Sequence, residues 1–92
     1  MKFSIQHQRD TVGNDVTVGA EAEGREQISR VKVTLDGFDI GDDPVDPPAV
    51  SYERQFLQVG DASPHRPHQL TVTITDPEGN IKSADRRWED PN

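Results

Sequence analysis

The chain has 92 residues, a net charge of −7 and no cysteine. Its length suits one domain, so residues 1–92 are predicted to form a single unit. The absence of thiols excludes disulfide frameworks, thiolate nucleophiles and cysteine-based zinc sites. The negative charge repels phosphate backbones and anionic lipid surfaces, so we expect no nucleic-acid partner. No apolar run approaches membrane-spanning length, so we expect no membrane insertion.

Apolar and polar residues alternate through the first third of the chain, as is typical of half-buried strands. Strands are predicted at residues 3–7, 16–23 and 28–35, with turn residues at 10–15 between the first two. Ile28 is out of phase with the residues that follow, so we expect it in the turn or at a bulge.

The middle of the chain is irregular. Residues 36–37 form a turn signal, and residues 38–40 are predicted to start a short extra strand. Residues 41–50 contain three prolines and three aspartates, which predicts a long surface connection. Residues 51–59 are strand-like, with a bulge expected near Phe56, and residues 60–68 are predicted as a second loop.

The last third carries the clearest pattern. In residues 70–75 the apolar residues leucine, valine and isoleucine alternate with threonine, and most of these side chains are β-branched. Residues 76–80 have the proline and glycine of a hairpin loop. Residues 81–88 return as the last strand, and 89–92 are predicted as a frayed tail. Short strands at this spacing predict an all-β fold, an immunoglobulin-like β-sandwich of 6–7 antiparallel strands.

Three segments support a family resemblance. Residues 68–80 resemble the F–G hairpin of bacterial Ig-like repeat domains, which often reads H-x-L-x-V-x-A-x-D-x-x-G-N. Residues 83–88 look like the closing strand of these domains, and residues 31–37 are similar to their V-x-V-x-x-D-G strand. Fibronectin type III domains share such motifs. The resemblance implies adhesion, carbohydrate-associated, spacer or secretion-linked roles, in a secreted or surface context.

The N-terminal segment bears on location. Residues 1–8 contain one lysine but no apolar region, so they do not form a secretory signal. As written, the chain is therefore expected in the cytoplasm, whereas the family resemblance favours a secreted or surface setting.

An acidic stretch offers a candidate metal site. Five aspartates fall within eleven residues, and a flexible loop dense in carboxylates could supply the oxygens that Ca²⁺ requires. They are Asp36, Asp39, Asp42, Asp43 and Asp46. The alternative is a solvated acidic connection stiffened by its prolines. No other cofactor is expected.

Histidines offer a second, weaker metal hypothesis. His65 and His68 could begin a transition-metal site with His7 as a third ligand. The alternative for His68 is a structural role at the entry to a strand.

Three aromatic residues are candidates for ligand stacking. Tyr52, Phe56 and Trp88 could form a platform for a sugar or peptide, although a thin core favours packing inside.

Catalytic patterns are missing from the sequence. The serines lack a nucleophile-elbow context, no glycine-rich phosphate loop exists, and the carboxylates lack an apolar setting. We therefore expect no enzyme, but a binding or spacer module that presents loops and sheet edges to a protein or glycan. Residues 3–7 and 38–40 are the candidate edges. One alternative is a Ca²⁺-dependent module ordered through residues 36–46. Another is an accessory or adaptor protein of a bacterial secretion or surface assembly.

Overall fold

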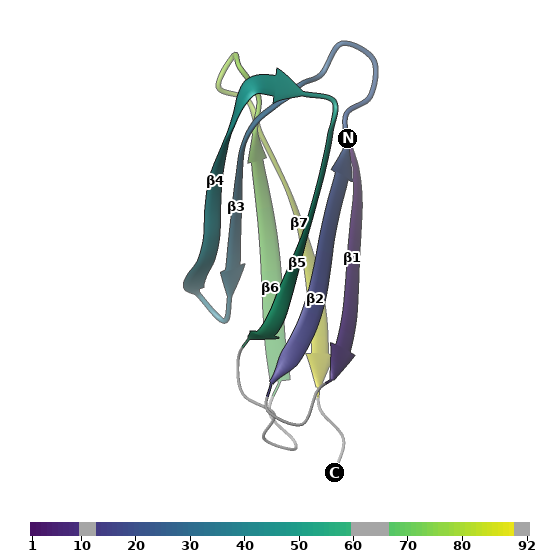
Figure 1. Ribbon diagram of the computed structural model, residues 1–92, viewed down its shortest axis with the longest axis vertical. Coiled ribbons are helices and arrows are strands. Elements are labelled where there is room, and N and C mark those ends of the chain that lie inside the picture. The colour runs from purple at the N-terminus through teal and green to yellow at the C-terminus, as the bar shows by residue number, and fades with distance from the viewer. Residues whose placement is uncertain (10–12, 60–66, 90–92) are drawn as a thin grey trace.

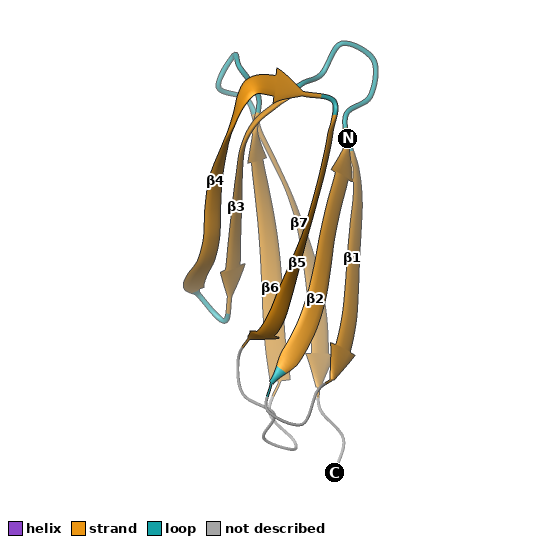
Figure 2. Cartoon of the chain, in the orientation of Figure 1, coloured by secondary structure: helices purple, strands orange, loops and turns teal. Residues whose placement is uncertain are grey.

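The computed structural model describes residues 1–9, 13–59 and 67–89, and these form seven antiparallel strands in two sheets (Figures 1 and 2). One sheet has three strands in the order β1-β2-β5, and the other has four in the order β4-β3-β6-β7. The predicted all-β sandwich is therefore confirmed. The strands are β1 (Lys2–Arg9), β2 (Asn14–Glu21), β3 (Ile28–Leu35), β4 (Phe38–Ala49), β5 (Ser51–Val59), β6 (Pro67–Thr75) and β7 (Ile81–Glu89).

The core lies between the two sheets and is built from the alternate residues of the central strands. Because side chains in a strand point to opposite faces in turn, each alternating segment contributes every second residue to the interior. The largest contributions come from β2, β3 and β6. The buried apolar residues are Val16, Val18, Ala20, Ile28, Val31, Val33, Leu35, Phe56, Leu70, Val72 and Ile74.

Both predicted bulges are present. The pairing of β3 with β4 shifts register between Ile28 and Arg30, which lets Ile28 reach the core. The pairing of β2 with β5 shifts where Val16 lies opposite Phe56 and Asn14 lies opposite Val59, so β5 carries one extra residue there. The extra residue in β5 explains why the apolar phase breaks there, whereas at Ile28 the extra residues of the shift belong to β4.

The predicted connection over residues 41–50 is wrong, because most of it belongs to β4, a twelve-residue edge strand. Pro44 lies opposite Arg30 of β3, at the edge of the four-stranded sheet. An edge strand hydrogen-bonds on one side only, so a missing N–H can face solvent without breaking the ladder. Proline therefore excludes a central strand here and does not exclude an edge strand.

The predicted hairpin after β6 is confirmed. Asp76 Oδ1 accepts hydrogen bonds from the backbone N–H groups of Glu78 and Asn80 at 2.9 and 2.8 Å, and Gly79 has a φ of 87°. Such a φ is readily adopted by glycine and costs other residues energy.

Some predictions fall at or beyond the limits of the described residues. The predicted loop over 60–68 lies outside them as far as residue 66, and residues 67–68 belong to β6. Of the tail predicted at 89–92, Glu89 belongs to β7, and residues 90–92 lie outside the described residues. The described part of the chain contains no helix able to cross a membrane.

Candidate functional site

Four of the five aspartates of the predicted calcium site lie along β4, where neighbouring side chains point to opposite faces. Asp42 is on the outer face of the four-stranded sheet, and its carboxylate accepts two hydrogen bonds from Arg30, at 2.8 and 2.6 Å. This hydrogen bonding lowers the pKa of Asp42. Asp39 forms an ion pair with Lys32 at 3.6 Å. Each of these carboxylates is matched with a cation of β3.

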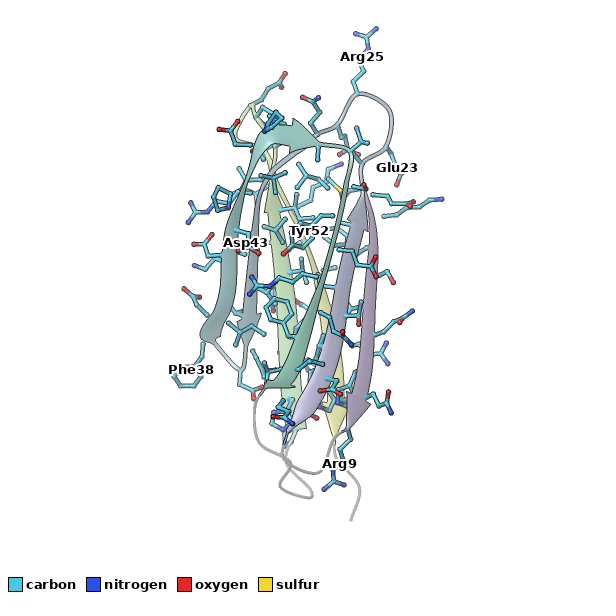
Figure 3. The ribbon with its side chains drawn as sticks, viewed as in Figure 1. Arg9, Glu23, Arg25, Phe38, Asp43 and Tyr52 are labelled. Carbon is cyan, nitrogen blue, oxygen red and sulfur yellow. The ribbon has the colours of Figure 1, made fainter. Side chains whose placement is uncertain are left out.

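Asp43 points the other way and helps to close one flank of the sandwich (Figure 3). Its Oδ2 accepts hydrogen bonds from the Tyr52 hydroxyl at 2.9 Å and from Arg54 Nη1 at 2.6 Å. The Arg54 guanidinium lies 4.5 Å from the centroid of the Phe56 ring, and this ring packs against the backbone of Gly41. Together these contacts tie β4 to β5 across the two sheets.

Electrostatics agree with this geometry. Hydrogen bonds from Tyr52 and Arg54 lower the pKa of Asp43. Burial, followed by the hydrogen bond to Asp43, raises the pKa of Tyr52 to about 12. The ionised carboxylate and the neutral phenol are therefore the stable forms at neutral pH.

Asp36 lies in the β3–β4 turn and bonds to β6. Its Oδ1 accepts the backbone N–H of Gln69 at 2.8 Å, and its Oδ2 lies 2.6 Å from Nδ1 of the buried His68. The structure thus spreads the acidic stretch over three different sets of partners. The described residues contain no group of three or more histidine, aspartate or glutamate side chains arranged to hold a metal. The calcium site, Asp46 included, stays a prediction to which this geometry adds no support.

His7 and His68 lie beside the same aromatic ring. The His7 ring stacks on Trp88, with centroids 4.0 Å apart, and the His68 ring is tilted against Trp88 at 5.7 Å. His7 Nε2 also lies 2.8 Å from Oδ1 of the buried Asn14. His65, the remaining histidine of the predicted metal site, is outside the described residues.

The three predicted platform residues face the interior. Phe56 is buried, and Tyr52 and Trp88 are partly buried against the core. Core packing, the alternative weighed for these rings, is therefore what the structure shows.

Two contacts bridge the flank formed by β1 and β7, the His7–Trp88 stack and a hydrogen bond from Arg86, and they leave part of it uncovered. A hollow of about 300 Å³ lies there between the two sheets, lined by Phe3, Ile5, Ala84, Asp85 and Arg86. Arg86 Nη1 donates a hydrogen bond of 3.2 Å to the backbone carbonyl of Ile5, which links β7 to the edge of β1.

A larger hollow lies on the other side of β1, over the outer face of the three-stranded sheet. It has a volume of about 660 Å³, and Gly19 leaves its floor without a side chain. A Cβ atom at Gly19 would lie 3.6 Å from Cβ of Ser4, an ordinary contact. The lining residues include Lys2, Ser4 and Gln6 of β1, so β1 borders both hollows.

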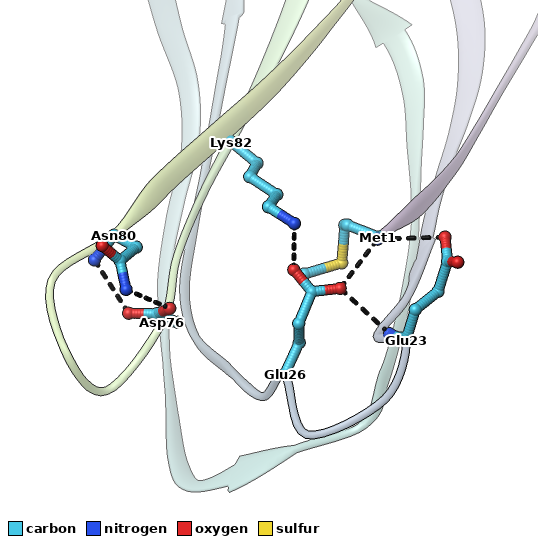
Figure 4. Close-up of polar contacts among 6 residues, drawn as sticks. All are labelled: Met1, Glu23, Glu26, Asp76, Asn80 and Lys82. Carbon is cyan, nitrogen blue, oxygen red and sulfur yellow. Dashed lines mark hydrogen bonds and ion pairs between the residues drawn. The ribbon is translucent and has the colours of Figure 1, made fainter.

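Beyond one end of the β1–β7 flank, a carboxylate links two strands (Figure 4). Glu26, in the loop between β2 and β3, accepts hydrogen bonds from the Met1 amino group and from Lys82 of β7. The two bonds lower the pKa of Glu26 to about 2, and the bond from Lys82 is the larger cause.

Sequence reasoning missed the role of Arg86. The signal was the phase of β7, in which Lys82, Ala84, Arg86 and Trp88 lie opposite the inward residues of β6. Two cations in an inward phase indicate a flank that the opposite sheet does not cover.

Comparison with known proteins identifies the fold. No protein-family model matches the chain, and no curated protein matches it. Among solved structures, the chain is similar to the fibronectin(III)-like modules of Clostridium thermocellum CbhA, with a TM-score of 0.53 and 18% sequence identity. The match covers 96% of this chain and 97% of that one. The chain has a fibronectin type III-like fold. The likeness at this identity concerns the fold alone, and it confirms the predicted Ig-like or fibronectin-like sandwich.

Proposed function

We propose that this chain is a non-enzymatic interaction module that binds a protein partner through its β1 side. One observation carries the proposal, namely the asymmetry of the two flanks. Asp43, Tyr52 and Arg54 close the β4–β5 flank with side-chain contacts, whereas the β1–β7 flank, bridged by the His7–Trp88 stack and by Arg86, keeps a hollow and a free strand edge. A free strand edge offers backbone groups for which an incoming chain can compete.

The fibronectin type III-like fold supports a binding or spacer role over an enzymatic one, because modules of this fold are generally non-catalytic. A protein partner is favoured over a glycan, because Tyr52, Phe56 and Trp88, the predicted platform for a sugar, pack against the core, and Phe38 is the one strongly exposed aromatic ring among the described residues. The same surface would serve an accessory protein within a larger assembly.

Site-specific photo-crosslinking tests the proposal. A photoreactive side chain is placed at Ser4 or Gln6 on the outer side of β1, or at Thr73 on the outer face of the four-stranded sheet as a matched control. In extracts of the source cells, we expect one protein to crosslink at the β1 positions and not at Thr73. Equal crosslinking at all three positions, or no crosslinking together with turnover of a small molecule, would contradict the proposal.

A further inference from the structure

Strand β1 differs from the other three sheet edges in lacking protection against strand addition. Strand β4 carries Pro44, Pro47 and Pro48, and β5 is interrupted by a bulge where Gln58 has a φ of 54°. Strand β7 has charged residues at five of its nine positions. In β1, by contrast, residues 3–8 contain no proline, no glycine, no aspartate, glutamate, lysine or arginine, and no break in register. Edges that must stay unpaired normally carry at least one of these devices.

The backbone of β1 shows which groups its free edge presents. The carbonyl of Ile5 accepts a hydrogen bond from Arg86 of β7, so it points away from β2. In an antiparallel pair, the N–H and C=O of one residue point to the same side, and the side alternates along the strand. Phe3, Ile5 and His7 therefore present their backbone groups to the free edge.

The side chains next to this edge provide an apolar surface. Phe3 and Ile5 are only partly buried, and with Ala84 they line the hollow of about 300 Å³. An added strand would place every second side chain over this hollow, because alternate side chains share one face. Apolar residues at these positions would bury Phe3 and Ile5 more completely.

The charge around the edge selects the partner. Strands β1 and β7 together carry five basic and two acidic residues, whereas the whole chain has a net charge of −7. Of the basic residues, Lys82 is already paired with Glu26 of the β2–β3 loop. Lys2 lies at one end of β1, and the exposed Arg86 stands beside its middle. This cationic flank on an acidic molecule favours a partner segment rich in aspartate or glutamate.

We infer that the free edge of β1 binds an extended acidic segment of a protein partner as an added β-strand. In the complex, a backbone N–H of the segment replaces Arg86 at the Ile5 carbonyl, and the released guanidinium pairs with a carboxylate of the segment. A second copy of this chain fits less well, because pairing of β1 with β1 would bring together Lys2, Arg9 and Arg86 of both copies. The inference rests on the proposed function and specifies its partner.

Peptide titration of the full chain, followed by NMR of its backbone amides, tests the inference. The probe is a terminally blocked octapeptide of alternating valine and glutamate, compared with peptides in which lysine or glutamine replaces glutamate. We expect the glutamate peptide to shift the amides of Phe3, Ile5 and His7 and to slow their hydrogen exchange. The lysine peptide should leave these amides unchanged. Equal effects of all three peptides, or effects centred on β4 or β5, would overturn the inference.

Two substitutions at Ile5 separate edge pairing from side-chain contact. Ile5→Pro removes the outward N–H, whereas Ile5→Val keeps it with a side chain of similar size. We expect Ile5→Pro to abolish binding of the glutamate peptide and Ile5→Val to retain it. Unchanged binding by Ile5→Pro would refute strand addition.

The Arg86→Gln variant provides a test that does not depend on whether the Ile5→Pro variant folds. It should reduce the preference for the glutamate over the glutamine peptide by about two- to fivefold, the range of an exposed ion pair. An unchanged preference would show that Arg86 does not select acidic partners.

If the peptide tests fail while β1 still crosslinks to a partner, the strand-addition mechanism is wrong and the proposed function stands. Sedimentation of the unliganded chain as a dimer with protected β1 amides would point to self-association.

Discussion

Tyr52 provides an optical test of the closed β4–β5 flank, because it is the only tyrosine in the chain. Burial and the 2.9 Å hydrogen bond to Asp43 raise its pKa from 10.0 to about 12. We therefore expect the near-ultraviolet absorbance of its phenolate to appear with a midpoint near pH 12 in the native chain. In urea the midpoint should return to about 10, the value of an unperturbed phenol.

The stability of the Tyr52→Phe variant measures the hydrogen bond itself. A hydrogen bond to a charged group is worth about 1.5–3 kcal/mol, and a neutral one about 1 kcal/mol. The Asp43 side chain is 38% exposed and keeps its bond to Arg54. We therefore expect Tyr52→Phe to lower the free energy of unfolding by about 1 kcal/mol. Urea denaturation at neutral pH measures this free energy of unfolding.

The sign of the pH dependence follows from the raised pKa. The stabilisation that comes from the neutral phenol is present below pH 10.0 and is lost as the pH rises toward 12. The difference in free energy of unfolding between the unmodified chain and Tyr52→Phe should therefore decrease as the pH rises from 10.0 toward 12.

Asp43→Asn serves as the control for Tyr52. It should lower the pKa of Tyr52 but leave it above 10.0, because burial is the larger cause of the shift. A native midpoint at pH 10, or equal stability of Tyr52→Phe and the unmodified chain at neutral pH, would refute the closed flank.

Four further predictions follow from the structure. Gly41→Ala should destabilise the chain by about 1–3 kcal/mol in thermal melts, because its Cβ would lie 2.9 Å from the Phe56 ring. Gly19→Ala should change stability by less than about 0.5 kcal/mol, since it meets only an ordinary contact, and equal losses in both variants would contradict the packing. The lowered pKa of Glu26 implies stability that is present above pH 4.5 and lost as the pH falls toward 2, so urea midpoints of Glu26→Gln should show a weaker acid dependence. Millimolar Ca²⁺ should leave the melting midpoint unchanged, and a rise reversed by a chelator would instead support the site at residues 36–46.

The strands could be predicted because their information is local. In β6, Leu70, Val72 and Ile74 alternate with threonines, and the Asp76 hairpin that follows uses side-chain bonds to its own backbone. Strand β4 could not be predicted this way. Its prolines and aspartates have low strand propensity, and the segment is extended because it pairs with β3 along most of its length. Tertiary pairing here outweighs local preference.

The hypothesis of a calcium site started from the same predicted loop. In a loop, five aspartates within eleven residues could converge on one ion. In a strand, Asp42 and Asp43 must point to opposite faces, and they bond to Arg30 and Arg54 respectively. Closeness in sequence therefore did not predict closeness of the carboxylates.

Charged residues in the inward phase of a strand have different partners on the two flanks, and this difference supports the proposed site at β1. On the β4–β5 flank, Asp43 and Arg54 neutralise each other across the sheets at 2.6 Å. On the β1–β7 flank, Arg86 bonds to a backbone carbonyl of Ile5 at 3.2 Å. A cation paired with a carboxylate gains little from an incoming acidic chain, whereas one held by a neutral carbonyl gains an ion pair. We therefore expect an exchange of partners to be favourable at Arg86 and unfavourable at Arg54, which supports the inference that an acidic strand adds to β1.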